Sequence, residues 1–446
     1  MTLNKQYVTL LAMFLITGTA DLRAQQKQTD IYITLNQSLA LAKEHNISLK
    51  VSEEEVNVAA YNEKISFQEK LPDLEFSAGY NRLANIKQFE NNGLLHQATT
   101  YDVPNQQYHF TLGLSVPIYA GGRIKAEEKI ATLKTEVAHL GHKKEERAIK
   151  LSVVTAFLQI QLLMDQRTLI ASKIKEDSIM IKQVEALKNN GKVTKNELLR
   201  TKLQSANHHM ILSEVTNNIL IAEHQLATLL NLPSDKKLHI VEEDLVAQEP
   251  QTILPLESYL TGAFEDHEEI KSAEQQILIM QQEKKLVKAN YLPQVNLKGD
   301  YGLSYPNFMF FPPEPYLYGF GLVGLDLKYS ISNLYKNKAK MQRVKSEISK
   351  QQYEAIDVRE KINHLVFAAY RKVLEADERI LIAQEAIAQA TENYRLVKMR
   401  YINKLSLISE LIDADNTFLE AQSAFITAHI NRRLNYYQLQ FAVGKM

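Results

Sequence analysis

The chain has 446 residues, with 52 Lys and Arg against 52 Asp and Glu, so its formal net charge is zero. This balance argues against a nucleic-acid partner, which would need a basic stripe. The sequence has no cysteine, which excludes a disulfide framework, a thiolate metal site, a cysteine nucleophile and a lipid-modified N-terminal cysteine.

The first predicted element is a secretory signal over residues 1–24. Lys5 supplies a positive start, residues 7–16 are apolar, and the small Ala24 suits a cleavage site. A membrane anchor is the alternative, but a spanning helix needs about 20 apolar residues, and this run is shorter. We expect no other stretch to reach spanning length, so any membrane crossing must be made by strands.

An internal repeat defines the rest of the chain. Residues 35–80 align without a gap with residues 256–301, at an offset of 221, and ten aligned positions are identical. Self-similarity of this kind indicates one structural unit used twice. We therefore expect two structural repeats, at 25–255 and 256–446.

The first repeat is predicted to contain, in chain order, a helix over 36–69, strands at 73–83 and 107–119, a helical hairpin over 123–232 and an irregular belt segment over 233–255. Alternation predicts the strands, because Leu74, Phe76 and Tyr80 share one side. Residues 84–107 are polar and are expected to form an exposed loop.

The second repeat is predicted to contain a helix over 256–290, strands at 294–305 and 316–331 and a helical hairpin over 333–443. In its last strand the apolar phase changes, from Tyr318 and Phe320 to Val323 and Leu325. This change predicts a β-bulge near Leu322.

Strands of this length, each with one apolar and one polar face, are typical of transmembrane β-barrels. A half-buried sheet in a soluble domain is the alternative. Four strands cannot close a barrel, and an open sheet edge cannot lie in lipid, so three copies would be needed to give twelve strands. The long helices carry apolar positions every three or four residues, which predicts helix-on-helix packing. A coiled-coil rod would share this pattern but would explain neither the strands nor the signal.

The second strand ends in the sequence Val-Pro-Ile-Tyr-Ala-Gly-Gly-Arg at 116–123. Pro117 cannot donate to a strand ladder, Gly121 and Gly122 permit unusual backbone angles, and Arg123 begins the long helix. This motif resembles the strand-to-helix junction of the TolC-like outer-membrane efflux proteins, and the resemblance covers essentially the whole mature chain. The second repeat has Leu-Lys-Tyr-Ser-Ile-Ser-Asn at 327–333, so the motif is degraded there.

The resemblance implies a mixed α and β membrane protein: a long periplasmic α-helical barrel of coiled hairpins, and a trimeric twelve-stranded β-barrel with four strands per protomer. It implies a homotrimer in outer-membrane lipid, with the helical tube in the periplasm. The implied function is passive exit of small toxic compounds, delivered by an inner-membrane pump and a periplasmic adaptor. A conduit for type I protein secretion stays an alternative, and a coiled-coil scaffold without a channel is a weaker one.

The turns between the paired helices are the predicted adaptor-contact tips of the tube. They comprise Gly191, Lys192, Val193 and Thr194 in the first repeat and Asn403, Lys404 and Leu405 in the second. Gly191 suits a left-handed helix end, and Thr194 and Ser406 can cap the following helices. Lys404 replaces the glycine usual in similar proteins, so we expect a differently shaped second turn.

Acidic residues near the tips are the best candidates for a pore site. Glu410 and Asp413 are three residues apart, hence on one helix face, and threefold repetition would make a ring of carboxylates at the entrance. Solvated acids at a helix N-terminus are the alternative. The resemblance also implies gating contacts that involve Tyr401, Glu197, Asn196 and Ser406.

The sequence offers no metal site or enzyme site. His208 and His209 are adjacent, so they point apart on a helix and are expected to be solvated. His139 and His142 lack a third ligand in sequence and are read the same way. We find no paired acids, nucleophile or cofactor fingerprint, so we expect neither catalysis nor a cofactor.

Overall fold

A computed structural model of the chain describes residues 30–89, 98–233, 237–241 and 252–446, and the predicted signal at 1–24 lies outside them. The mixed α and β fold class is confirmed. The strands are β1 (Asp30–Ile33), β2 (Asp73–Arg82), β3 (Ile86–Phe89), β4 (Ala98–Tyr101), β5 (Gln106–Tyr119), β6 (Lys237–Ile240), β7 (Gln294–Tyr305) and β8 (Tyr318–Lys328). The helices are α2 (Leu35–His45), α3 (Ile47–Gln68), α4 (Arg123–Asn189), α5 (Lys195–Leu229), α6 (Leu256–Asp266), α7 (Glu268–Ala289), α8 (Asn333–Ile402) and α9 (Ile408–Val443).

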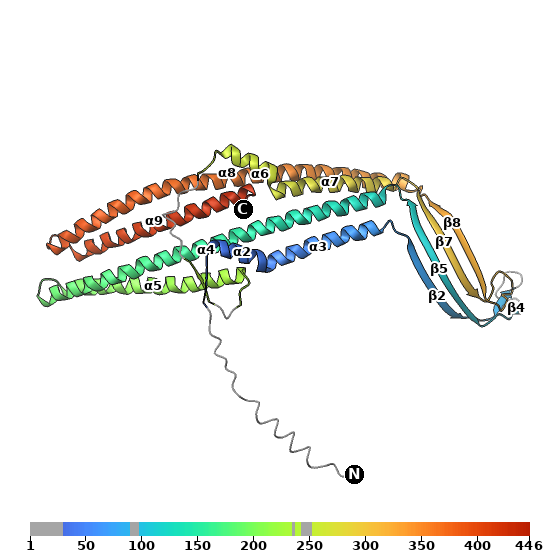
Figure 1. Cartoon of the computed structure of the whole chain (residues 1–446), viewed down its shortest axis with the longest axis horizontal. Coiled ribbons are helices and arrows are strands. Elements are labelled where there is room, and N and C mark those ends of the chain that lie inside the picture. Colours follow the sequence, from blue (N-terminus) through green and yellow to red (C-terminus); the bar gives the residue numbers. More distant parts are fainter. Residues whose placement is uncertain (1–29, 90–97, 234–236, 242–251) are drawn as a thin grey trace, which may run out of the picture. The chain divides into compact units, whose positions relative to one another are not determined.

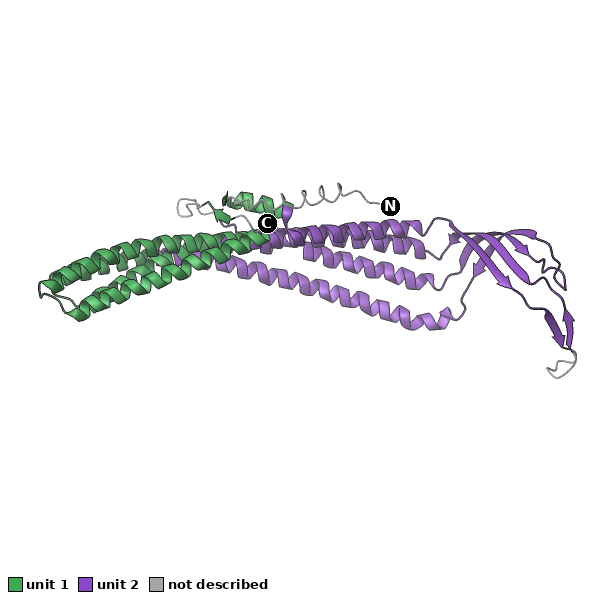
Figure 2. Ribbon diagram, turned by 90° about the horizontal axis from the view of Figure 1, so that it is seen from below, with its two compact units in different colours: residues 1–44, 153–248, 383–430 green, residues 45–152, 249–382, 431–446 purple. Residues whose placement is uncertain are grey.

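The chain divides into two compact units, each assembled from both halves of the sequence (Figure 2). The first comprises residues 1–44, 153–248 and 383–430 and contains the turns between the paired helices. The second comprises residues 45–152, 249–382 and 431–446 and contains the larger sheet. Each unit is described by itself below.

The larger sheet has the strand order β2-β5-β7-β8, and all neighbours are antiparallel (Figure 1). Its register places Leu74, Leu114, Gly299 and Val323 in one row on the apolar face. The neighbouring row, with Glu75, Gly113, Asp300 and Leu322, lies on the opposite face. Successive side chains of a strand point to opposite faces, so the sheet has one apolar and one mainly polar face.

The predicted bulge near Leu322 was wrong. The pairing of β7 with β8 is continuous from Gln294 opposite Lys328 to Ser304 opposite Tyr318. The irregularity lies instead in β5, where the register shifts between Pro117 and Tyr119. Proline has no N–H to donate to a strand ladder, so it is confined to edges, ends and bulges of sheets. This explains why the irregularity lies at Pro117.

Two segments expected to be irregular contain strands. The predicted loop at 84–107 contains β3 and β4, which pair antiparallel. The predicted belt segment at 233–255 contains β6, which pairs parallel with β1. Both strands of each pair are only four residues long, which gives too little periodicity for sequence reasoning to detect.

The helix that precedes each strand pair is broken, although a continuous helix was predicted in both repeats. Asn46 separates α2 from α3, and its side chain accepts a hydrogen bond from the Leu49 amide at 3.2 Å. His267 separates α6 from α7, and its Nδ1 accepts one from the Glu269 amide at 3.2 Å. Since 46 and 267 differ by the repeat offset of 221, the duplication preserves the break and changes the capping residue.

Helix α4 corrects another prediction. Among the described residues, it is the one helix whose length and composition would allow it to cross a membrane. No such stretch was expected. Its side chains at Val153, Val154, Phe157 and Leu158 are at most 1% exposed. Burial within the protein accounts for an apolar run of this kind.

Candidate functional site

The two tip turns have the same backbone shape. Gly191 has a φ of 68° and Lys404 a φ of 61°, both in the left-handed region. The amide of Lys192 donates to the Leu187 carbonyl and that of Leu405 donates to the Arg400 carbonyl, which completes a Schellman motif at each helix end. The expectation of a different second turn was therefore wrong. Lys404 adopts the strained angle because the turn hydrogen bonds require it, at a cost of about 1 kcal/mol.

The residues after the turns behave differently in the two hairpins. Thr194 caps α5 in a capping box, in which its hydroxyl accepts from the Glu197 amide and the Glu197 carboxylate accepts from the Thr194 amide. Ser406 was also expected to cap a helix. Its hydroxyl instead donates to the Glu410 carboxylate, two residues after the start of α9.

The structure brings Tyr401 and Glu197 together across the two hairpins. The Tyr401 hydroxyl donates to Glu197 Oε2 at 3.5 Å, while the other oxygen of Glu197 holds the cap of α5. Tyr401 is buried and packs with Val184, Leu198 and Leu411. Burial, followed by the charge of Glu197, raises the pKa of Tyr401 to about 12, so the hydroxyl keeps its proton and remains a donor. Asn196 is exposed beside this contact.

Glu410 and Asp413 both lie exposed on α9. Leu411 and Ala414, which directly follow them in the sequence, are buried. The two carboxylates are three residues apart and both exposed, so they share one exposed face of α9, as their spacing predicts. Within the described part of the chain, the Ser406 hydroxyl donates a hydrogen bond to the Glu410 carboxylate.

A buried polar network lies close to the tip turns, and sequence reasoning missed it. Lys173 on α4 forms an ion pair with Asp415 on α9, and the two residues are 5% and 8% exposed. Lys173 also contacts Glu176 at 2.9 Å and lies 5.0 Å from the ring centroid of Tyr394 on α8. Burial raises the pKa of the Asp415 carboxyl, and the hydrogen bond and charge of Lys173 oppose this.

A second arm of the network joins three helices. His208 on α5 contacts Asp177 on α4, with 2.6 Å between Nδ1 and Oδ2, and Gln204 bridges His208 to Asn416 on α9. The two arms surround a cavity of about 100 Å³ that Lys173, Asp177 and Gln204 help to line. Charged and amide groups, rather than apolar packing alone, therefore join the α4–α5 hairpin to α9 at this level.

The histidines were partly misjudged from sequence. His208 is 2% exposed, so its predicted solvation was wrong, although the neighbouring His209 is exposed as expected. His139 is exposed, and His142 Nδ1 lies 2.8 Å from the Ser52 hydroxyl. No group of three or more potential metal-ligating side chains occurs within the described ranges.

The strand-to-helix junction has the conformation that its glycines permit. Gly121 and Gly122 have φ angles of 62° and 85°, and the Arg123 amide donates to the Ala120 carbonyl at 3.0 Å. A side chain on Gly121 would approach the Ala289 carbonyl to 3.0 Å. The degraded second junction makes the same type of turn, with the Asn333 amide donating to Ser330, and does so without a described residue of positive φ.

Comparison with known proteins identifies two matched stretches. The family described as outer membrane efflux protein matches residues 38–232 and 261–445. The first stretch lies within residues 25–255 and the second within residues 256–446. None of the curated proteins searched matches the chain significantly.

Solved structures share the fold over almost the whole chain. The outer membrane protein VceC from Vibrio cholerae has a TM-score of 0.75 at 16% identity, with 92% of this chain and 96% of that chain covered. The open state of the Neisseria gonorrhoeae MtrE outer membrane channel has a TM-score of 0.71 at 18% identity, with 92% and 88% covered. CusC, described in a study of transmembrane channel formation, has a TM-score of 0.77 at 13% identity, with 93% and 92% covered.

Proposed function

Because the chain belongs to the outer membrane efflux protein family, we propose that it is the outer-membrane exit duct of a tripartite efflux system. It passively exports small toxic compounds that an inner-membrane pump and a periplasmic adaptor deliver. One observation carries this proposal: the chain combines an amphipathic antiparallel sheet with helices of up to 70 residues. A sheet with one lipid-facing and one wet face suits a pore wall.

The apolar face of the sheet has the dimensions of a bilayer. Tyr80, Tyr108 and Tyr305 form a row across three strands, and the rings of Tyr108 and Tyr305 stack at a centroid distance of 4.9 Å. Tyr119 lies at the other end of β5. Eleven residues at about 3.4 Å each, tilted by about 40°, give a band roughly 28 Å tall between aromatic ends, as in outer-membrane barrels.

The sheet supports a trimer because its edge strands, β2 and β8, have no partner strand among the described residues. An open edge exposes backbone donors and acceptors, which lipid cannot satisfy. Pairing of β8 with β2 of the next copy would close twelve strands from three chains. The four-stranded sheet is thus one third of the barrel wall in this proposal.

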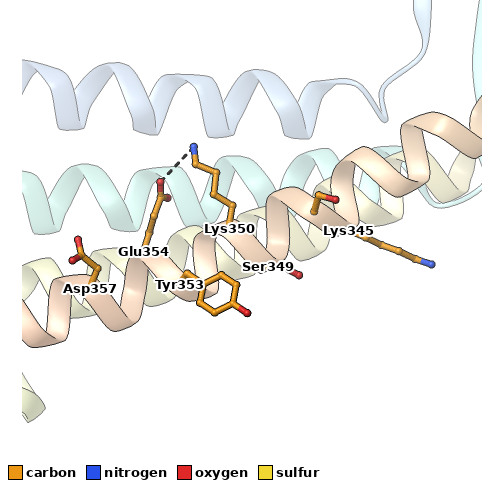
Figure 3. A pocket seen from close by; sticks show the side chains of 7 residues that line it. Lys345, Ser349, Lys350, Tyr353, Glu354 and Asp357 are labelled. Atoms are coloured by element: carbon orange, nitrogen blue, oxygen red, sulfur yellow. Dashed lines mark ion pairs between the residues drawn. The ribbon is translucent and has the colours of Figure 1, made fainter.

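The helices of the second unit also carry uncovered contact surfaces. On α3, Val51, Val58 and Ile65 are spaced by seven residues and are 55%, 59% and 56% exposed. On α8, Lys350 and Glu354 form an ion pair at 3.4 Å, drawn as a dashed line in Figure 3, and Tyr353 projects from another side of the helix and is 72% exposed. An exposed heptad stripe favours packing against a helix of another copy.

The tips provide the gate in this proposal. The turns at Gly191 and Lys404 meet the adaptor, and Glu410 and Asp413 from three copies line the entrance. The Tyr401–Glu197 hydrogen bond holds the α8–α9 hairpin to the α4–α5 hairpin in the closed state. Opening is an iris-like movement of the α8–α9 hairpin, and the partner pump supplies the energy.

Loss of this contact should raise conductance. We expect Tyr401→Phe with Glu197→Ala to remove about 1 kcal/mol from the closed state, which is about a fivefold shift toward the open state. Single-channel recording of the purified trimer in planar bilayers measures the shift. Tyr401→Phe with Glu197→Gln is the matched variant, since glutamine keeps an acceptor for the Thr194 cap. Unchanged conductance in both variants would remove the contact from the gate.

Accumulation of a fluorescent pump substrate tests the efflux function directly. Cells without this protein should accumulate more substrate than complemented cells. No difference in accumulation, together with loss of secreted proteins, would favour the alternative conduit for protein secretion. A scaffold without a channel is tested by extraction, because it predicts no detergent-dependent trimer in outer membranes.

A further inference from the structure

Three large apolar side chains lie on the wet face of the sheet. Alternation along β8 puts Tyr318, Phe320 and Leu322 on the same face, and the continuous register pairs them with Ser304, Gly302 and Asp300 of β7. Those β7 positions belong to the polar face. The three side chains are called the β8 lumen patch here, because the polar face lines the lumen in the proposed barrel.

Packing on the opposite face confirms this phase. A side chain built on Gly319 would lie 3.0 Å from the Tyr301 hydroxyl, and one on Gly321 would lie 2.9 Å from the Tyr301 ring. The Tyr301 ring therefore covers these two glycines on the lipid side. The glycines alternate with the patch residues, so Phe320 and Leu322 project to the other side, where they are 54% and 49% exposed.

The surroundings of the patch are polar and acidic. The two rows that contain Tyr318 and Phe320 continue through His109 and Thr111 on β5. The row of Leu322 continues through Asp300 to Glu75. Charged residues on this face are Asp73, Glu75, Asp300 and Asp326 against Lys298 and Lys328, and Lys298 is already paired with Asp326 at 3.2 Å. The wall beside the patch therefore favours positive charge.

We propose that the β8 lumen patch binds aromatic cations as they pass through the channel. This inference rests on the proposed channel function. Exposed apolar patches with polar rims mark binding surfaces, and aromatic rings attract both other rings and quaternary ammonium groups. The ring of the cargo contacts Tyr318 and Phe320, and its charge lies toward Asp300.

A pair of matched probes tests the patch by current blockade in planar bilayers. Benzyltrimethylammonium and tetramethylammonium carry the same charge and differ by an aromatic ring. With the native trimer we expect blockades by the benzyl compound to last at least about fivefold longer, as expected for added ring contacts. Tyr318→Thr with Phe320→Thr should abolish this difference, because threonine keeps the strand propensity and removes the rings.

Two controls separate the possible causes. Val323→Thr makes the same kind of change on the lipid face of β8 and should keep the native difference. Asp300→Asn should shorten blockades by both cations. Equal blockades in the native trimer, or an undiminished difference in the double variant, would overturn the patch and leave the channel function intact. A native trimer without any conductance would overturn the channel function, and the patch with it.

Discussion

Replacement of Lys173 with methionine is expected to destabilise the first compact unit, which contains the tip turns, by about 3–5 kcal/mol, the usual cost of leaving one charge of a buried pair without its partner. Methionine preserves the length and apolar stem of lysine, so the loss is electrostatic. Asp415, at 8% exposed, would then keep a carboxylate that neither water nor Lys173 stabilises. Burial already raises the pKa of the Asp415 carboxyl, and the substitution should raise it further. At a pH where this carboxyl becomes protonated, the loss of stability falls toward about 3 kcal/mol.

Hydrogen–deuterium exchange of residues 408–416 in the detergent-solubilised protein measures this loosening locally. The double variant Lys173→Met with Asp415→Leu is the control, because it removes both charges. Replacement of a buried ion pair by apolar residues is often neutral or stabilising, so exchange in the double variant should return close to the native rate. An equal increase in both variants would mean that Lys173 and Asp415 contribute by packing and not by charge.

The pair also bears on gating. Lys173 and Asp415 join α4 to α9, the same hairpins that Tyr401 and Glu197 join. The single variant should therefore raise conductance more than loss of the 3.5 Å tyrosine contact does, because a buried charge pair is worth more than one long hydrogen bond. A native conductance in the Lys173→Met variant would mean that only the turn contacts control gating.

The repeat and the alternation were enough to predict the paired strands and long hairpins, since both signals are local and periodic. The Lys173–Asp415 pair could not be predicted in this way. The two residues are 242 positions apart, and each looks like one more charge on a long polar helix. Only the packing of α4 against α9 shows that these charges are buried together.

Leu322 and Lys404 show how local rules can mislead. The apolar phase changes at Leu322, and a bulge is the usual explanation. In the structure the register is continuous, and the apolar side chains lie on the polar face of the sheet instead. At Lys404 the absence of glycine suggested a new turn, but the Schellman hydrogen bonds impose a left-handed angle on lysine. In both cases the backbone hydrogen bonds decide the geometry, and the side chains follow.

His267 should make the second unit sensitive to acid. Burial, followed by the charge of Arg147, lowers the pKa of His267 to about 4 in the folded protein. An unfolded histidine titrates near 6.5, so the unfolded chain takes up a proton over this range and the folded one does not. Stability is therefore fully present above pH 6.5 and is lost as pH falls, by about 3 kcal/mol at pH 4. Protonation of Nδ1 would also remove the acceptor that caps α7.

The first repeat supplies the matched variant for this prediction. Asn46 caps α3 at the aligned position, so His267→Asn should keep the cap of α7 and lose the titration. Unfolding followed by circular dichroism at pH 7.5 and pH 4 gives the comparison, with exchange at the Glu269 amide as the local measure. The two proteins should be similarly stable at pH 7.5, and the variant should be more stable at pH 4. If the native protein and the variant lost the same stability at pH 4, acid would act at other groups. The break between α6 and α7 would then tolerate a protonated His267 beside Arg147.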